Sequence, residues 1–433
     1  MKTDLKKPFP LAQNTRTARS ARPQTLFTFR GMLPCPSGWR FAIILGLTLC
    51  SSAGQAQRDT WAKKADMPTA RQSLSTCAVN GKIYAIGGVN YPGVDTEVSR
   101  AVEEYDPTTD LWASKADMPT SRNWPASAAV NGKIYVIGGD RTYLNTPRRT
   151  LEEYDPVTDT WSPKADMPTA RSSLAAAVVD GKIYVIGGLT TFGAPPLPTV
   201  EAYDLLTDSW QPKAGMPTPR GMLCASVVNG KIFAIGGFVS PSGPPLRVVE
   251  MYDPLTDRWT RKADMPTARG GLASSTAHGR IYVVGGRDPL LATVEEYDPF
   301  TDTWTKRADM RSTNPDDPAK RWALSTSEVN DRIYAIGGAI YIQPPYQTLS
   351  LVLEYTPPVT APALQVKLVN NGPVLRLEWM SRVDCFDLLQ SRNQLQTNGW
   401  TEVEKLSGTG ETLSKDIPAS GAAGFYRLQR ELR

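Results

Sequence analysis

The sequence has a single histidine, His278, among 433 residues, so it cannot supply a metal site that needs two imidazole ligands. Of its five cysteines, cleavage after Ala56 would leave only Cys77, Cys224 and Cys385. This odd, sparse set excludes a disulfide framework, and no two cysteines have the spacing of a zinc site. Gly-x-Ser-x-Gly motifs, phosphate-binding loops and metal-binding helices are also missing. We therefore predict neither a cofactor nor a metal site.

A global basic field is also missing from the folded part of the chain. The net charge is +5, but residues 1–56 hold eight basic residues and one acid. The remaining 40 basic and 42 acidic residues give a net charge of −2. Because nothing in this balance would attract a polyanion, we expect no nucleic-acid partner.

The N-terminal apolar run is too short to span a bilayer. It covers residues 41–49, follows Arg40, and precedes small residues at Gly54 and Ala56. This order is typical of a secretory signal peptide with cleavage after Ala56. We interpret residues 1–56 as an N-terminal extension plus signal peptide, and a start at Met32 would give a signal of 25 residues. The mature chain is expected to be periplasmic or extracellular, possessing no transmembrane segment.

What the sequence has in abundance is a repeat marked by paired glycines. The pairs recur every 49 to 52 residues, at Gly87-Gly88, Gly138-Gly139, Gly187-Gly188, Gly236-Gly237, Gly285-Gly286 and Gly337-Gly338. A period of this length indicates one supersecondary unit copied six times. Cys77 and Cys224 occupy positions that hold Ser or Ala in other copies, so we expect them to be small buried residues.

Each unit reads as four antiparallel strands. In residues 171–220, Asp180-Gly181 separates two runs of small and β-branched residues, which predicts a hairpin whose turn residues have positive φ. His278 fills the same turn slot in another copy and is predicted to be a turn residue. A third strand, an Asp-Pro-x-Thr-Asp turn and a fourth strand containing Trp follow. Four such strands, repeated radially, describe a blade of a β-propeller.

The ends of the repeat array predict that the ring closes. The folded part begins with Asp59-Thr60-Trp61, which matches the end of the fifth unit at Trp304. The sixth unit ends near Tyr355 without a tryptophan in register. The first strand should therefore complete the last blade and remove two exposed sheet edges. The predicted fold is all-β, a six-bladed propeller closed by an N-terminal strand.

The paired glycines, the tyrosine of Glu-Glu-Tyr-Asp-Pro and the following tryptophan resemble the signature of kelch repeats. The resemblance covers residues 57–358 and implies a six-bladed kelch propeller. Some periplasmic kelch propellers interconvert sialic-acid anomers or epimers, whereas the copper chemistry of galactose-oxidase-like relatives needs two histidines. Residues 359–433 break the period, and we interpret them as a linker and a small sandwich-like all-β module, similar to modules that end many bacterial secreted proteins.

One face of the propeller should carry the variable loops after each Gly-Gly, where recognition usually resides. The same face should carry one arginine at the start of each innermost strand, namely Arg71, Arg122, Arg171, Arg220, Arg269 and Arg321. Six guanidinium groups around an axis could bind a carboxylate or sulfate. Alternatively, each arginine pairs with a backbone carbonyl or local acid, and their presence in all six units favours this structural role.

Trp124 and Trp322 are more informative, because sister units have Ser, Gln or Gly in these positions. An indole ring there could stack on a sugar or on a protein side chain. The loop aromatics Tyr91, Tyr143 and Tyr341 complete the candidate ligand-binding set. The paired acids such as Glu103-Glu104 recur in other units and point to opposite faces of a strand, so they do not form a catalytic dyad. No catalytic residues are predicted.

These observations favour an exported, non-enzymatic binding protein that presents one loop-lined propeller face to a protein or glycan. The alternative is a sialic-acid mutarotase or epimerase of the kelch type, in which an arginine holds a carboxylate and an acid moves a proton. A structural envelope component is a third hypothesis.

Overall fold

The structure is a computed structural model. It describes residues 59–90, 98–141, 146–191, 193–240, 243–287, 289–311, 319–340 and 347–358, together with the backbone of six further strands between 366 and 432. The tyrosines at 91, 143 and 341 lie outside the described residues. No helix in these ranges is long and apolar enough to cross a membrane.

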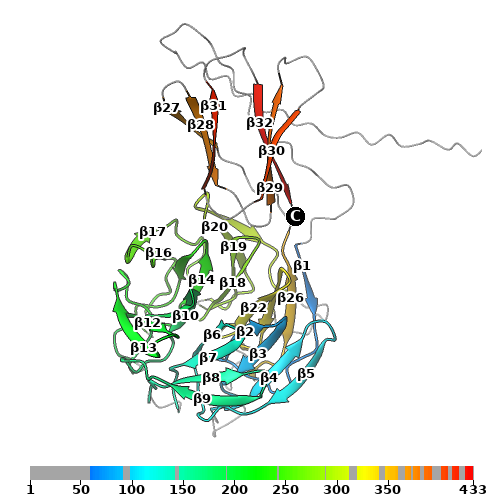
Figure 1. The fold of residues 1–433 in the computed structure, drawn as a ribbon. Coiled ribbons are helices and arrows are strands. Elements are labelled where there is room, and N and C mark those ends of the chain that lie inside the picture. The colour runs from blue at the N-terminus through cyan, green and yellow to red at the C-terminus, as the bar shows by residue number, and fades with distance from the viewer. Residues whose placement is uncertain are drawn as a thin grey trace, which may run out of the picture.

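Six four-stranded antiparallel sheets form the propeller, and five of them use consecutive strands (Figure 1). Blade 1 contains β2 (Ser75–Val79), β3 (Lys82–Ile86), β4 (Val102–Asp106) and β5 (Leu111–Lys115). Blade 2 contains β6 (Ala126–Val130), β7 (Lys133–Ile137), β8 (Leu151–Asp155) and β9 (Thr160–Lys164). Blade 3 contains β10 (Ala175–Val179), β11 (Lys182–Ile186), β12 (Val200–Asp204) and β13 (Ser209–Lys213).

Blade 4 contains β14 (Cys224–Val228), β15 (Lys231–Ile235), β16 (Val249–Asp253) and β17 (Arg258–Arg261). Blade 5 contains β18 (Ala273–Ala277), β19 (Arg280–Val284), β20 (Val294–Asp298) and β21 (Thr303–Arg307). Blade 6 combines β22 (Ser325–Val329), β23 (Arg332–Ile336) and β26 (Val352–Thr356) with β1 (Thr60–Lys63). A short hairpin of β24 (Ala339–Ile340) and β25 (Gln347–Thr348) follows β23. The innermost strands contact one another in the cyclic order β2, β6, β10, β14, β18, β22 and β2.

The N-terminal strand closes the ring, as the sequence predicts. β1 pairs antiparallel with β26, and Trp61 lies opposite Tyr355. Their ring centroids are 4.9 Å apart. In Figure 1 the blue β1 lies beside the gold β26, so strands from the two ends of the propeller share one sheet.

The predicted hairpin turns are confirmed by their backbone angles. Asp180 and Gly181 both have positive φ, and His278 has a φ of 50° in the equivalent turn of blade 5. Cys77 and Cys224 are buried free cysteines, which confirms that they act as small core residues.

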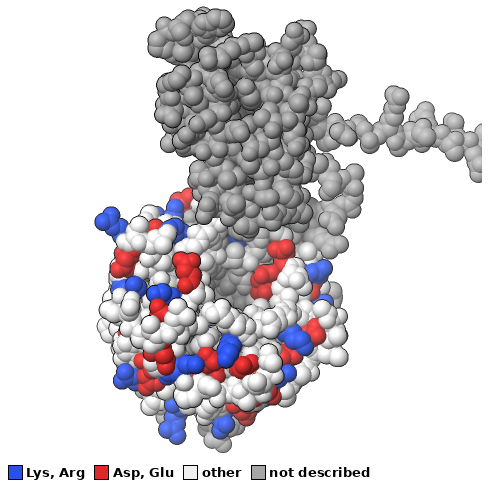
Figure 2. Space-filling view, in the orientation of Figure 1, with Lys and Arg blue, Asp and Glu red and all other residues white. Residues whose placement is uncertain are grey.

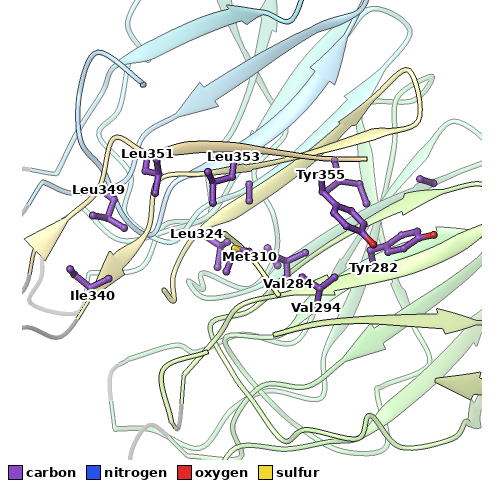
Figure 3. Packing of buried hydrophobic residues seen from close by; sticks show 14 residues of the cluster. Tyr282, Val284, Val294, Met310, Leu324, Ile340, Leu349, Leu351, Leu353 and Tyr355 are labelled. Atoms are coloured by element: carbon purple, nitrogen blue, oxygen red, sulfur yellow. The ribbon is translucent and has the colours of Figure 1, made fainter. Parts of the chain in front are cut away.

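Adjacent blades pack through apolar side chains. Between blades 5 and 6, Tyr282 and Tyr355 face each other with ring centroids 5.8 Å apart (Figure 3). Val284, Leu324 and Leu353 lie in the same buried cluster. Because these side chains are shielded from water on both sides, each blade stabilises its neighbours.

A hydrogen-bonded clamp fastens each outer strand to the connection that enters its blade. In blade 1, Trp112 Nε1 donates to the carbonyl of Ala65, while Asp110 accepts from the Ala65 amide and from the Tyr105 hydroxyl. The equivalent indole bonds recur for Trp161, Trp210, Trp259, Trp304 and Trp61. The recurring Tyr, Asp and Trp are therefore parts of one clamp.

The C-terminal strands form two three-stranded sheets. One has the order β27 (Val366–Asn371), β28 (Val374–Met380) and β31 (Thr412–Pro418), and the other has β30 (Thr401–Ser407), β29 (Cys385–Arg392) and β32 (Phe425–Leu432). All of their pairings are antiparallel.

Candidate functional site

The six repeated arginines are completely buried. Arg71 donates to the carbonyls of Gly87 and Ala101 and forms an ion pair of 2.6 Å with Glu103. The other four pairs, at 2.6 to 3.0 Å, are Arg122–Glu152, Arg171–Glu201, Arg220–Glu250 and Arg269–Glu295. Burial lowers the pKa of Arg171 to about 10, although the Glu201 carboxylate opposes this change.

The sixth arginine has a different environment. Arg321 donates to the carbonyls of Gly337, Leu351 and Ala335, and Leu353 stands where the other blades have the glutamate. All six guanidinium groups thus bind oxygen atoms of the protein itself. This corrects the suggestion that they form a solvent-facing ring for an anion, because none of them is exposed.

The Arg–Glu pairing could have been found in the sequence. In blades 1 to 4 the glutamate follows its arginine by 30 to 32 residues, two positions before the repeated tyrosine, and in blades 1 and 2 it is the first of the paired acids. The second acid of each pair points the other way: Glu104 accepts from Tyr84 and Lys82. The opposite orientations predicted for these acids are therefore confirmed.

A closed ring of backbone hydrogen bonds surrounds the propeller axis on the loop face. It runs from the amide of one residue to the carbonyl of its counterpart in the preceding blade, at 2.8 to 3.2 Å. We call these residues the axial ring: Ser73, Trp124, Ser173, Met222, Gly271 and Ala323. All six have positive φ, between 52° and 59°. The bond from the Ser73 amide to the Ala323 carbonyl closes the ring.

Trp124 and Trp322 meet across this ring. Trp124 belongs to the axial ring in blade 2, and Trp322 precedes the axial-ring residue of blade 6. Their ring centroids are 6.0 Å apart, and both side chains are partly exposed. A Cβ added to Gly271 of blade 5 would lie 3.0 Å from the Trp322 ring and 3.8 Å from Trp124. The small residue of blade 5 therefore leaves the space that the two indoles fill.

The aromatic group continues from Trp322 around the face. The guanidinium carbon of Arg287 lies 4.5 Å from the Trp322 ring centroid and 5.0 Å from that of Phe238, which places a cation between two aromatic rings. We call Phe238, Arg287, Trp322 and Trp124 the axial aromatic cluster. Sequence reasoning singled out the two tryptophans but missed their contact and the cation beside them.

One packing rule explains this arrangement. In blades 4, 5 and 6 the residue before the axial-ring residue lies against the residue that follows Gly-Gly in the preceding blade. Trp322 lies against Arg287 in this way, and Cβ atoms added to Gly270 and Gly221 would meet Phe238 and Leu189. Glycine at 270 makes room for the large Phe238 ring.

The distribution of charged side chains on the propeller surface does not indicate the charge of a ligand. Basic and acidic side chains are interspersed over the side of the propeller seen in Figure 2, and neither sign forms a continuous field there. Within the described part of the chain, no group of three or more His, Cys, Asp and Glu residues could hold a metal ion.

Comparison with known proteins places most of the chain in one family. A model described as the KLHDC2/KLHL20/DRC7 Kelch-repeats domain matches residues 49–188 and 126–338. The F-box/kelch-repeat protein At1g67480 of Arabidopsis thaliana is 38% identical over 96 residues, which are 21% of this chain and 25% of that protein. The influenza virus NS1A-binding protein homolog of Mus musculus is 44% identical over 73 residues, 17% of this chain and 11% of that protein.

These matched segments span a quarter or less of the curated relatives. Among solved structures, the one titled "Structure of YjhT" is similar with a TM-score of 0.55 and 17% sequence identity. The similarity covers 66% of this chain and 96% of that one, and it shows the fold alone.

Proposed function

The chain belongs to the kelch-repeat family, and on that premise we propose that it is an exported, non-enzymatic binding scaffold whose loop face receives a protein or glycan ligand. Kelch propellers commonly bind proteins, and the mouse relative is named for binding one. The export part of the proposal rests on the signal-peptide pattern of residues 32–56.

The observation that carries the proposal is the pairing of Trp124 with Trp322. The repeated arginines, tyrosines and clamp tryptophans already have partners inside the scaffold. Trp124 and Trp322 occupy positions that other blades fill with Ser73, Ser173 or Ser172, so the fold does not require an indole there. A partly exposed aromatic pair on a rigid ring is the kind of surface that dominates binding energy in interfaces.

The experiment compares partner capture by the mature chain, beginning at residue 57, with capture by the double variant Trp124→Ser, Trp322→Ser. We expect a loss of at least about tenfold in bound partner, because interface tryptophans contribute strongly to binding. Leu206→Ser is the matched control, since Leu206 is 96% exposed on the opposite face. Capture that survives the double variant, or that is lost with Leu206→Ser, would refute the assignment to the loop face.

A further inference from the structure

Two arginines without an acidic partner follow the Gly-Gly pair of blade 2. Arg141 is exposed and Arg148 is partly buried. Within the described residues neither of them forms an ion pair, whereas the adjacent Arg149 is paired with Asp166 at 3.6 Å. Charges of both signs are interspersed over the side of the propeller seen in Figure 2, so two like charges without an acid are a local exception.

A short antiparallel hairpin brings these two side chains to the same face. The Arg148 amide donates to the Gly139 carbonyl at 2.8 Å, and the Arg141 amide donates to the Thr146 carbonyl at 3.3 Å. Arg148 therefore lies opposite Gly139, which has no side chain. Arg141 lies opposite Thr146, so the two arginines are diagonal neighbours on one face of the hairpin. Diagonal neighbours have Cα atoms about 7–8 Å apart, which long side chains can span.

The acids near this pair are already engaged or lie on the other face. Burial, and after it the Arg141 guanidinium, lowers the pKa of Arg148, although Glu152 opposes this change. The Glu152 carboxylate is itself paired with Arg122 at 3.0 Å. Asp140 stands between the two hairpin positions and therefore points to the opposite face. The repulsion between the two guanidinium groups is left without a neutralising carboxylate.

Arg148 is also a departure from the repeat. In every blade the equivalent residue donates its amide hydrogen to the carbonyl of the second glycine. Four blades have leucine in this position and blade 1 has serine, namely Leu197, Leu246, Leu291, Leu349 and Ser99. The fold therefore accepts an apolar residue here and does not require a cation.

The outer end of the Arg148 side chain is accessible to a ligand. Its Nε is buried without a hydrogen-bond partner in the described part of the chain, which shows that the stem packs against the blade. The Nη groups form no hydrogen bond there and are not buried, so they have access to solvent beside the exposed Arg141. Two guanidinium groups present planar sets of N–H donors that match the oxygens of a carboxylate. An anion would relieve their repulsion, whereas a cation would add to it.

We propose that Arg141 and Arg148, which we call the basic pair, bind the carboxylate of an aspartate or glutamate side chain presented by a protein partner. The inference rests on the proposed binding function and names the charge of the partner at one point of the loop face. The hairpin is joined to the axial ring, because Asp140 exchanges backbone hydrogen bonds with Asn123, the residue before Trp124. The basic pair and the aromatic pair are therefore parts of one surface.

The test follows the arginine side-chain signals of the isotope-labelled mature chain by NMR while defined probes are added, since single ion pairs bind weakly. The probes are acetyl-Gly-Glu-Gly-amide, its glutamine analogue, and methyl glucuronide as a sugar carboxylate. We expect the glutamate peptide to shift the signals of both arginines and the glutamine peptide to shift neither. Methyl glucuronide should bind more weakly than the glutamate peptide.

Two variants probe the site itself, and each is read on the arginine that remains. Arg148→Leu copies four sister blades, so the propeller should fold, and the affinity for the glutamate peptide should fall at least about tenfold, as for a charged hydrogen bond. Arg141→Thr copies Thr190 of blade 3 and should have a similar effect. Arg149→Gln is the matched control, because it removes one neighbouring positive charge that already has a partner, and it should leave binding unchanged.

Four results would overturn the inference: no shift with the glutamate peptide, equal shifts with the glutamine peptide, tighter binding of methyl glucuronide, or unchanged affinity in Arg148→Leu. If the double tryptophan variant abolishes partner capture but the glutamate peptide does not bind, the binding function stands and the role of the basic pair is refuted. If the peptide binds the basic pair while partner capture survives the double tryptophan variant, the site assigned to the partner fails instead.

Discussion

The indole Nε1 of Trp61 donates a hydrogen bond to the carbonyl oxygen of Ala308, 3.0 Å away and 247 residues apart in sequence. The same bond joins Trp161 to Ala116 within the continuous part of the ring. Asp59 repeats the rest of the clamp, since it accepts from the Ala308 amide and the Tyr355 hydroxyl. The closure of the propeller therefore uses the contacts that hold every other blade.

Because Trp61 closes the ring, Trp61→Ala should destabilise the whole propeller. We expect a loss of about 3 kcal/mol in the free energy of unfolding, measured by urea denaturation, as for other large-to-small substitutions of packed aromatics. Deletion of residues 57–62 should cost more, since it also removes the pairing of β1 with β26. Trp161→Ala is the matched control and should have a similar effect. An unchanged stability of Trp61→Ala beside a destabilised Trp161→Ala would contradict the closure.

The ring and its closure could be predicted from sequence because the repeat marks them directly. Asn80-Gly81 and its counterparts need positive φ, and Asp59-Thr60-Trp61 is a recognisable copy of a fourth strand. The axial ring could not be predicted, because it is made only of backbone groups. Ser73, Trp124 and Met222 share a backbone angle and a hydrogen bond but no side-chain property.

The candidate site was only partly visible for a related reason. Trp124 and Trp322 stand out because they break the repeat. Their contact depends on Gly271 across the axis, and the position of Arg287 depends on its neighbours in two other blades. Such contacts join residues that are far apart in sequence and occur once, so no repeated pattern signals them. The six repeated arginines are the opposite case: the sequence pattern shows them clearly, but they recur because each is buried inside its blade and not because they face a ligand.

Replacing one partner of a buried ion pair should reduce the stability of the propeller more than replacing both partners together. Arg171→Met leaves the Glu201 carboxylate buried without its cation, and we expect a loss of about 3–5 kcal/mol in the free energy of unfolding. The double variant Arg171→Met, Glu201→Gln should recover part of this loss, although the carbonyls of Gly187 and Thr199 still lose a donor. A double-mutant cycle by urea denaturation measures the coupling. Strictly additive losses would contradict a paired role for these residues.

The clamp aspartates should make stability depend on acidic pH. Hydrogen bonds from the Tyr154 hydroxyl and the Ala116 amide lower the pKa of Asp159 below its ordinary value of 3.8, and Asp208 and Asp257 are lowered in the same way. A lowered folded-state pKa means that the stabilisation is fully present above the unfolded pKa and is lost as pH falls through the folded pKa. We therefore expect the free energy of unfolding to decrease below about pH 4.

Asp159→Asn should make this acid dependence shallower, because one carboxylate with a lowered pKa is removed. The comparison is a series of urea titrations between pH 3 and pH 7 for the variant and the parent. An identical slope in both proteins would show that Asp159 does not contribute to the linkage.

The two propeller thiols should be unreactive while the protein is folded. Burial raises the pKa of Cys77 to about 12 and that of Cys224 to about 11, so little thiolate exists at pH 8. We expect mass spectrometry to find no iodoacetamide adduct at either cysteine in native conditions and complete labelling in urea. Labelling at Cys77 or Cys224 faster than global unfolding would contradict their burial.

Gly270 offers the sharpest test of the packing rule on the loop face. A Cβ added there would lie 2.0 Å from Cε2 of Phe238, so Gly270→Ala must displace the ring. We expect a loss of about 1–3 kcal/mol in the free energy of unfolding, the usual cost of overpacking. Gly221→Ala is the control, because its nearest atom is the Leu189 Cγ at 3.1 Å, and it should cost less.

Phe238→Leu should partly rescue Gly270→Ala, since a Cβ added at the equivalent Gly221 lies 3.1 Å from Leu189, whereas one added at Gly270 lies 2.0 Å from Phe238. The double variant should also alter the surroundings of Arg287, which lies over the Phe238 ring. Urea denaturation of the four proteins in the cycle measures the coupling between positions 238 and 270. If the rescue fails and the two losses add, side chains at these positions do not share space.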